Sequence, residues 1–263
     1  MASLSAARPS RARRILIPSL VTAGILAIWQ LVCSVGLIPG YMLPSPVAVI
    51  LAFGKDPALL LSNTLVTLQE AMLGLIIGVG AGFIFAVGMD RFVTFQLALN
   101  PLITVSQTIP TIAIAPLLVL WFGYGLAPKV ILVVLTTFFP VTVSLVSGFS
   151  SVDPDLLDLM RTMRATRWQV FWNVKFPAAL SQFFSGLKIS ATYAIVGAVV
   201  AEWIGSSVGI GHMMTLYRKS FSYDSMFAVI LLISALSLAL MKLVDAIEHL
   251  VMPWENAQGK KIR

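Results

Sequence analysis

Charged side chains are scarce in this sequence. Asp, Glu, Lys and Arg make up 11% of its 263 residues, whereas apolar types account for 58%. A soluble globular domain has about 25% charged residues, so the composition excludes that class. The apolar runs are continuous rather than alternating, which favours membrane-spanning helices over strands. We therefore expect an all-α integral membrane protein.

Residues that carry catalytic or metal chemistry are also few. The single cysteine, Cys33, excludes an internal disulfide, and the two histidines, His212 and His249, fall on opposite sides of the membrane in the topology predicted below. The sequence contains no G-x-x-x-x-G-K-[ST] phosphate-binding loop and no H-E-x-x-H. We therefore expect no catalytic residue, metal, cofactor or ATP site in this chain.

Acidic side chains within the apolar runs are limited to a handful, mainly Glu70, Glu202, Asp245 and Glu248. A proton relay needs acidic groups or histidines deep in a helix bundle, so a self-powered symporter is disfavoured. If the chain transports a solute, we expect the energy to come from another subunit.

Six apolar runs are long enough to cross a bilayer, which takes about 20 residues. They lie near 15–37, 62–88, 92–121, 129–150, 178–203 and 225–250. With the N-terminus inside, the inner segments hold twelve Lys and Arg residues and the outer loops four. This positive-inside bias predicts cytoplasmic tails at 1–14 and 255–263 around a transmembrane domain at 15–254. The net charge of +7 is then explained by the basic residues on the cytoplasmic side of the membrane, and we expect no nucleic-acid partner.

Two of the runs have distinctive interiors. Gly74, Gly78 and Gly82 recur every fourth residue of the second run, which predicts close approach of a neighbouring helix. The third run is interrupted by Asn100 and several prolines, as in broken spans that line transport pathways. We name Gln107 and Trp121 as candidate pathway residues there; an ordinary kinked helix is the alternative.

The fifth run adds Tyr193 and Glu202 as candidate pathway residues. Tyr193 and Trp121 can stack on a heterocycle, or they can anchor span ends at the membrane interface. Glu202 can contact substrate, or it can make structural hydrogen bonds near the outer end of its span. Lys188, about two turns into the run, is expected to reach back to the cytoplasmic interface.

The longest polar stretch between spans is the 151–177 segment. Asp153 has the features of an N-cap and is followed by Pro154 at the first helical position. Thr166 and Gln169 have the spacing of a capping box, and Pro177 closes the segment. Apolar residues recur on one face of the first helix, so we expect two short helices that can dock on a partner.

The 151–177 segment resembles the EAA loop of bacterial ABC-importer permeases. The family pattern is Glu-Ala-Ala, three residues, Gly, nine residues and Ile-x-Leu-Pro; here Asp158 stands for the Glu, and Val174, Phe176 and Pro177 stand for the close. The stretches 106–130, 138–149 and 185–205 are similar to the nitrate/sulfonate/taurine branch. Residues 186–203 and 252–254 look most like permeases for thiamine-pyrimidine precursors.

The resemblance implies a type I ABC importer permease fold in the bacterial inner membrane, with both termini cytoplasmic and a coupling-helix loop. It also implies a second permease copy, two ABC ATPase subunits and a periplasmic or lipid-anchored substrate-binding protein. The solute would be a small organic nutrient: a thiamine-pyrimidine precursor or similar heterocycle, or a sulfonate- or nitrate-type anion. The residues expected to couple to the ATPase are Asp158, Leu159, Met160, Met163, Arg164, Ala165 and Trp168.

Arg164 is where this chain departs from the family pattern, because it occupies the glycine position. A left-handed residue other than Gly costs on the order of 1 kcal/mol. Either the turn is built differently, or Arg164 makes an added contact with the ATPase, or coupling is impaired. Two other functions stay open: an energy-independent channel or stand-alone secondary carrier, and a non-transporting membrane scaffold.

Overall fold

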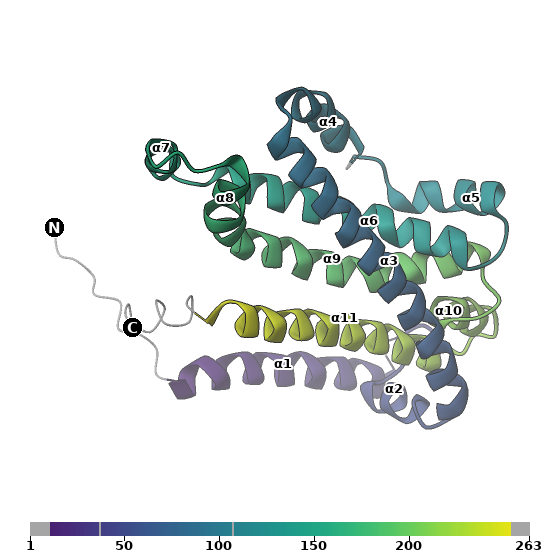
Figure 1. Cartoon of the computed structure of the whole chain (residues 1–263). Coiled ribbons are helices and arrows are strands. Elements are labelled where there is room, and N and C mark those ends of the chain that lie inside the picture. Colours follow the sequence, from purple (N-terminus) through teal and green to yellow (C-terminus); the bar gives the residue numbers. More distant parts are fainter. Residues whose placement is uncertain (1–10, 37, 107, 254–263) are drawn as a thin grey trace.

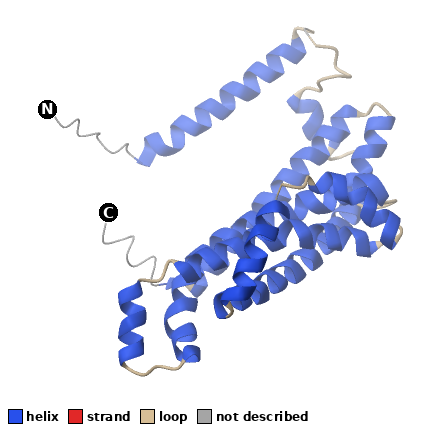
Figure 2. Cartoon of the chain, turned by 90° about the horizontal axis from the view of Figure 1, so that it is seen from above, coloured by secondary structure: helices blue, strands red, loops and turns tan. Residues whose placement is uncertain are grey.

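The computed structural model describes residues 11–253 except 37 and 107, and within them every regular element is a helix (Figures 1 and 2). The helices are α1 (Arg11–Ser34), α2 (Pro46–Ala52), α3 (Pro57–Arg91), α4 (Val93–Ser106), α5 (Thr111–Phe122), α6 (Leu126–Ser150), α7 (Pro154–Thr162), α8 (Arg167–Val170), the π-helical turn η1 (Phe171–Lys175), α9 (Phe176–Gly205), α10 (Ile210–Lys219) and α11 (Tyr223–Val251). The predicted all-α class is confirmed.

Five helices are long and apolar enough to cross a membrane: α1, α3, α6, α9 with its preceding turns, and α11. The predicted run 92–121 is divided into α4 and α5, which meet at a bend of 100°, and this pair makes a sixth span if it crosses as one broken unit. Pro110 occupies the N-cap of α5. Proline lacks an N–H and disfavours helix at the residue before it, which explains the break. Gln107, the pathway residue predicted at this point, lies outside the described residues.

One predicted loop contains a helix. The stretch between the last two spans was expected to be an outer loop, but residues 210–219 form α10. The helix follows Gly209, whose φ of +100° suits glycine. Its sequence, with apolar and polar residues on opposite faces, is too short to register as a span.

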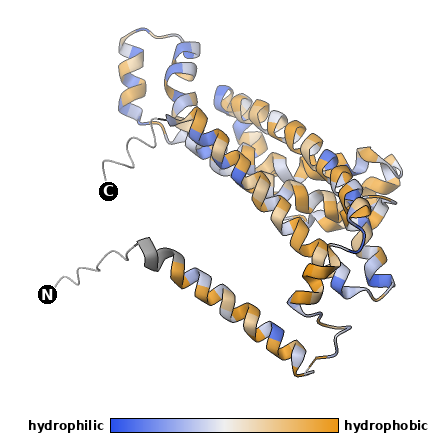
Figure 3. Ribbon diagram, turned by 90° about the horizontal axis from the view of Figure 1, so that it is seen from below, coloured by the Kyte–Doolittle hydropathy of each residue, from blue (hydrophilic) through white to orange (hydrophobic). Residues whose placement is uncertain are grey.

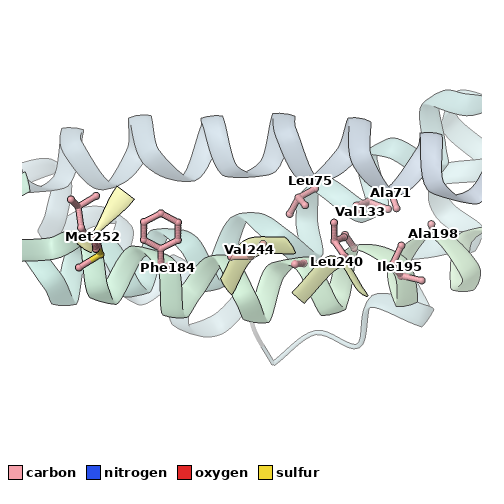
Figure 4. Packing of buried hydrophobic residues seen from close by; sticks show 12 residues of the cluster. Ala71, Leu75, Val133, Phe184, Ile195, Ala198, Leu240, Val244 and Met252 are labelled. Carbon is pink, nitrogen blue, oxygen red and sulfur yellow. The ribbon is translucent and has the colours of Figure 1, made fainter. Parts of the chain in front are cut away.

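The glycine stripe on α3 faces α6, as predicted. A Cβ atom added at Gly74 would lie 2.4 Å from Val133 Cβ, and one at Gly82 would lie 3.0 Å from Phe138 O. These glycines let the two helix backbones approach closely. The main apolar core lies beside this contact, among α3, α6, α9 and α11 (Figure 4), and includes Ala71, Leu75, Ile195, Leu240 and Val244.

α1 stands apart from the other spans. Figures 2 and 3 show it as a separate rod that approaches the rest of the chain at one end only. None of the residues 16–34 is buried within the chain. Trp29 of α1 contacts Phe227 of α11, with ring centroids 6.2 Å apart, close to a small cluster around Val49. The apolar surface of α1 is thus left for lipid or another protein.

Candidate functional site

The first helix of the 151–177 segment begins as the sequence predicts. The Asp153 side chain accepts a hydrogen bond from Asp155 N at 2.9 Å, and Pro154 is the first residue of α7. At α8, Thr166 Oγ1 accepts from Gln169 N at 3.3 Å while Gln169 Oε1 accepts from Thr166 N at 2.8 Å. Both predicted caps are confirmed, so two helix starts are fixed by local chemistry alone.

Between these helices the chain makes a Schellman turn with Arg164 at its left-handed position. Arg164 has φ +56°, and its N–H donates to Arg161 O at 2.9 Å. The N–H of Ala165 donates to Met160 O at 3.0 Å, which completes the motif. The turn is therefore the one that glycine favours. Of the three explanations for Arg164, a differently built turn is excluded.

The apolar face of this segment is left open by the rest of the chain. No residue of α7 or α8 is buried. Met163 is 70% exposed and Trp168 is 69% exposed, while Leu156 and Leu159 are also exposed. Figures 1 and 2 show α7 projecting from one end of the bundle. Asp158 and Arg161 form an exposed ion pair at 2.7 Å, a weak contact that leaves the apolar side uncovered.

The base of the segment, in contrast, is held firmly. Phe171 contacts Phe149 of α6 with ring centroids 5.5 Å apart, and Trp172 contacts Phe176 at 5.1 Å. Lys175 and Asp90 form an ion pair at 2.6 Å between η1 and the end of α3. A force applied to the segment would therefore reach α3 and α6 directly, because aromatic contacts and an ion pair join them.

At the far end of the bundle, Glu202 is part of a buried hydrogen-bond network. Its side chain is 1% exposed and accepts hydrogen bonds from Thr67 Oγ1 and from Gly211 N, each at 2.6 Å. Asn63 Oδ1 accepts from Gly209 N at 2.6 Å. Side chains of α3 and α9 thus occupy the free N–H groups at the start of α10.

A second buried pair adjoins this network. Lys129 of α6 and Glu70 of α3 form an ion pair at 2.5 Å, and both are buried. Glu70 lies one turn along α3 from Thr67, which donates to Glu202. Four helices, α3, α6, α9 and α10, therefore meet around polar groups. This cluster was not predicted from the sequence. The feature that could have indicated it is the presence of three ionisable residues, Glu70, Lys129 and Glu202, within or beside apolar runs.

The other candidate pathway residues lie elsewhere. Trp121 is exposed on α5 and Tyr193 is half exposed on α9. Within the described part of the chain, no hydrogen bond, ion pair or ring contact joins either residue to Glu202. Lys188 pairs with Asp245 at 2.9 Å and with Glu248 at 2.5 Å, so it links α9 to α11.

A cavity of about 400 Å³ lies between the end of α3, the middle of α4 and the second half of α6. It is lined by Met89, Asn100, Ile103, Thr104, Thr142, Val143, Val146 and Ser147. Small-molecule sites typically have volumes of about 300–1,000 Å³. Of these lining residues, only Asn100 stood out in the sequence, as an interruption of the third run. Nothing in the sequence indicated that residues of α6 would line the same cavity. A smaller hollow of about 190 Å³ near α10 is lined by Trp203, Met214, Thr215, Arg218 and Met226.

Comparison with known proteins gives a consistent match. Residues 78–253 match the family described as binding-protein-dependent transport system inner membrane component. The chain is 41% identical over 236 residues to a Haemophilus influenzae protein named "Probable ABC transporter permease protein", covering 90% of this chain and 96% of that protein. It is 32% identical to the formylaminopyrimidine transport permease protein ThiX of Halalkalibacterium halodurans, covering 94% and 99%. It is 29% identical to the taurine transport system permease protein TauC of Escherichia coli, covering 89% and 88%.

Solved structures show the same fold. A chain of an amino acid ABC transporter superposes with a TM-score of 0.64 at 19% identity, covering 76% of this chain and 97% of that one. A chain of the MetNI methionine ABC transporter in an inward-facing conformation superposes with a TM-score of 0.60 at 17% identity, covering 73% and 96%. The helical arrangement is therefore that of type I ABC importer permeases.

Proposed function

We propose that this chain is driven by a separate ATPase that docks on the 151–177 segment. The chain belongs to the family of binding-protein-dependent transport system inner membrane components, and it is the membrane-spanning permease subunit of an ATP-driven importer. The observation that carries the docking site is the uncovered apolar face of α7 and α8 on a firmly held base. Short amphipathic helices commonly bind by laying such a face into a groove.

The residues that contact the ATPase are then Asp158, Leu159, Met160, Met163, Arg164, Ala165 and Trp168. Met163 and Trp168 supply the most exposed apolar surface, which suits central anchors of a helix-in-groove contact. The end of the bundle with α7 is cytoplasmic in this proposal, as are both termini, in line with the excess of Lys and Arg there. Two ATPase subunits, a second copy of this chain and a substrate-binding protein complete the importer.

The transported solute is a small organic nutrient of the kind that the relatives' names state. Gln107, Trp121, Tyr193 and Glu202 remain the proposed pathway residues, with Glu202 acting by holding α10 in place. The runner-up, a channel or carrier that works alone, predicts the same spans but has no use for an exposed apolar face at α7.

Capture of the ATPase tests the docking site. Deletion of residues 154–164, or the single change Met163→Glu, should abolish co-purification of the ATPase, since a buried unpaired charge is costly in an apolar groove. Tyr124→Glu, a matched change at an exposed aromatic residue near the other end of the bundle, should leave capture intact. Capture that survived the deletion would overturn the assignment.

A further inference from the structure

The cavity between α3, α4 and α6 has a distinctive polar lining. Four of its eight lining residues, Asn100, Thr104, Thr142 and Ser147, carry uncharged polar groups, and the other four are apolar. None of the lining residues is charged. Asp90, next in sequence to Met89, is already paired with Lys175. A solute in this cavity would meet hydroxyl and amide groups but no unpaired lining cation.

The two threonines present acceptors rather than donors. Thr104 Oγ1 donates its proton to Asn100 O at 2.9 Å, and Thr142 Oγ1 donates to Phe138 O at 2.8 Å. A hydroxyl has one proton and two lone pairs, so each threonine keeps lone pairs for a partner. Those lone pairs match N–H donors of a solute and repel the oxygens of an anion.

Asn100 and Ser147 supply the complementary donors. Within the described residues, the side chain of neither one makes a hydrogen bond or ion pair. The amide of Asn100 offers two donors and an acceptor, and the Ser147 hydroxyl offers one donor. Met89, Ile103 and Val146 provide apolar surface between the polar groups, and a methionine sulfur makes favourable contacts with aromatic rings.

We infer that this cavity is a subsite for an uncharged heteroaromatic solute whose edge carries both N–H donors and acceptors, as an aminopyrimidine does, and that it disfavours sulfonate- or nitrate-type anions. This inference rests on the proposed function for the role of the site and narrows the substrate class. The lining gives an anion no counter-charge, and the lone pairs of Thr104 and Thr142 would face its oxygens.

A single reporter thiol tests the inference without the ATPase. Cys33 is the one native cysteine, so the full chain with Cys33→Ser and Val143→Cys carries one thiol, at an exposed apolar residue of the cavity lining. In membranes containing this variant, an excess of an aminopyrimidine should slow maleimide labelling severalfold, whereas taurine and nitrate should not. Ser150→Cys in the same background, seven residues away on α6 and absent from the lining, should label at the same rate with every probe.

The lining groups give a second readout. Adding Asn100→Leu to the Val143→Cys variant should remove the protection by the aminopyrimidine, because the amide that recognises its edge is lost. Protection by taurine or nitrate, or no protection by the aminopyrimidine, would overturn the inference. The proposed function would be untouched by either result, since it depends on ATPase capture at the 151–177 segment.

Discussion

At Arg164 the backbone turns left-handed although the residue carries a Cβ atom. The two hydrogen bonds of the Schellman turn are both made, so the turn has the geometry that glycine adopts without strain. The residue is exposed, and no ion pair is formed by its guanidinium within the described part of the chain. Backbone strain that persists at an exposed, uncompensated position is characteristic of functional sites.

Replacement of Arg164 should therefore reveal the strain. Arg164→Gly is expected to raise the free energy of unfolding by about 1 kcal/mol, because glycine has no Cβ penalty at positive φ. Arg164→Ala removes the same side chain but keeps Cβ, so it should give no such gain. Thermal unfolding of the purified protein in detergent measures both, and a lower melting temperature for Arg164→Gly would contradict the account.

The glycine stripe makes a second residue-scale prediction. A Cβ atom at Gly74 would meet Val133 Cβ at 2.4 Å, while nothing lies within 4 Å of one at Gly80. Gly74→Ala should destabilise the protein by about 1–3 kcal/mol through overpacking. Gly80→Ala, on the same helix, should be neutral or slightly stabilising, since alanine is the better helix former. Equal effects of the two changes on the melting temperature would show that the stripe does not set the α3–α6 distance.

Among the elements, α10 depends on side chains from two other helices. Glu202 and Asn63 accept hydrogen bonds from backbone N–H groups at its start, and Glu202 is buried. A cap of this kind satisfies donors that a helix cannot satisfy itself. α10 should therefore behave as a unit that stays ordered only while the Glu202 network is intact.

Loss of the Glu202 side chain should loosen α10 selectively. Glu202→Ala leaves buried N–H and hydroxyl groups without an acceptor, at a cost of about 1–3 kcal/mol. Hydrogen exchange of the amides at 209–214 should then accelerate, while exchange in α7, at the other end of the bundle, should not change. Uniform acceleration over the whole chain would indicate general destabilisation instead of a specific role in holding α10.

The elements that were predictable from sequence are those with local signals. Long apolar runs gave α3, α6, α9 and α11, and the caps at Asp153 and Thr166 gave α7 and α8. The prolines of the third run also indicated a break between α4 and α5, whereas the helix α10 and the Lys188 ion pairs were not foreseen. Each depends on contacts between residues far apart in sequence, and helical periodicity carries no information about such contacts.

At the scale of the whole molecule, two features lie at opposite ends of one bundle. The 151–177 segment is open at its tip and joined at its base to α3 and α6. The Glu202 network joins the far ends of α3 and α9 to α10. α3 takes part in both, and the cavity lies between α3, α4 and α6. A displacement at α7 thus has a continuous helical route along α3 to the opposite end, and the cavity lies beside that route.

Solute uptake in proteoliposomes tests the central claim, that this permease is driven by a separate ATPase acting on the 151–177 segment. Vesicles containing this chain, its ATPase and its substrate-binding protein should accumulate a labelled aminopyrimidine when ATP is supplied on the ATPase side. Vesicles with the chain alone, or with the 154–164 deletion in the full complex, should accumulate none. Uptake by the chain alone without ATP would contradict the account and identify a channel or stand-alone carrier.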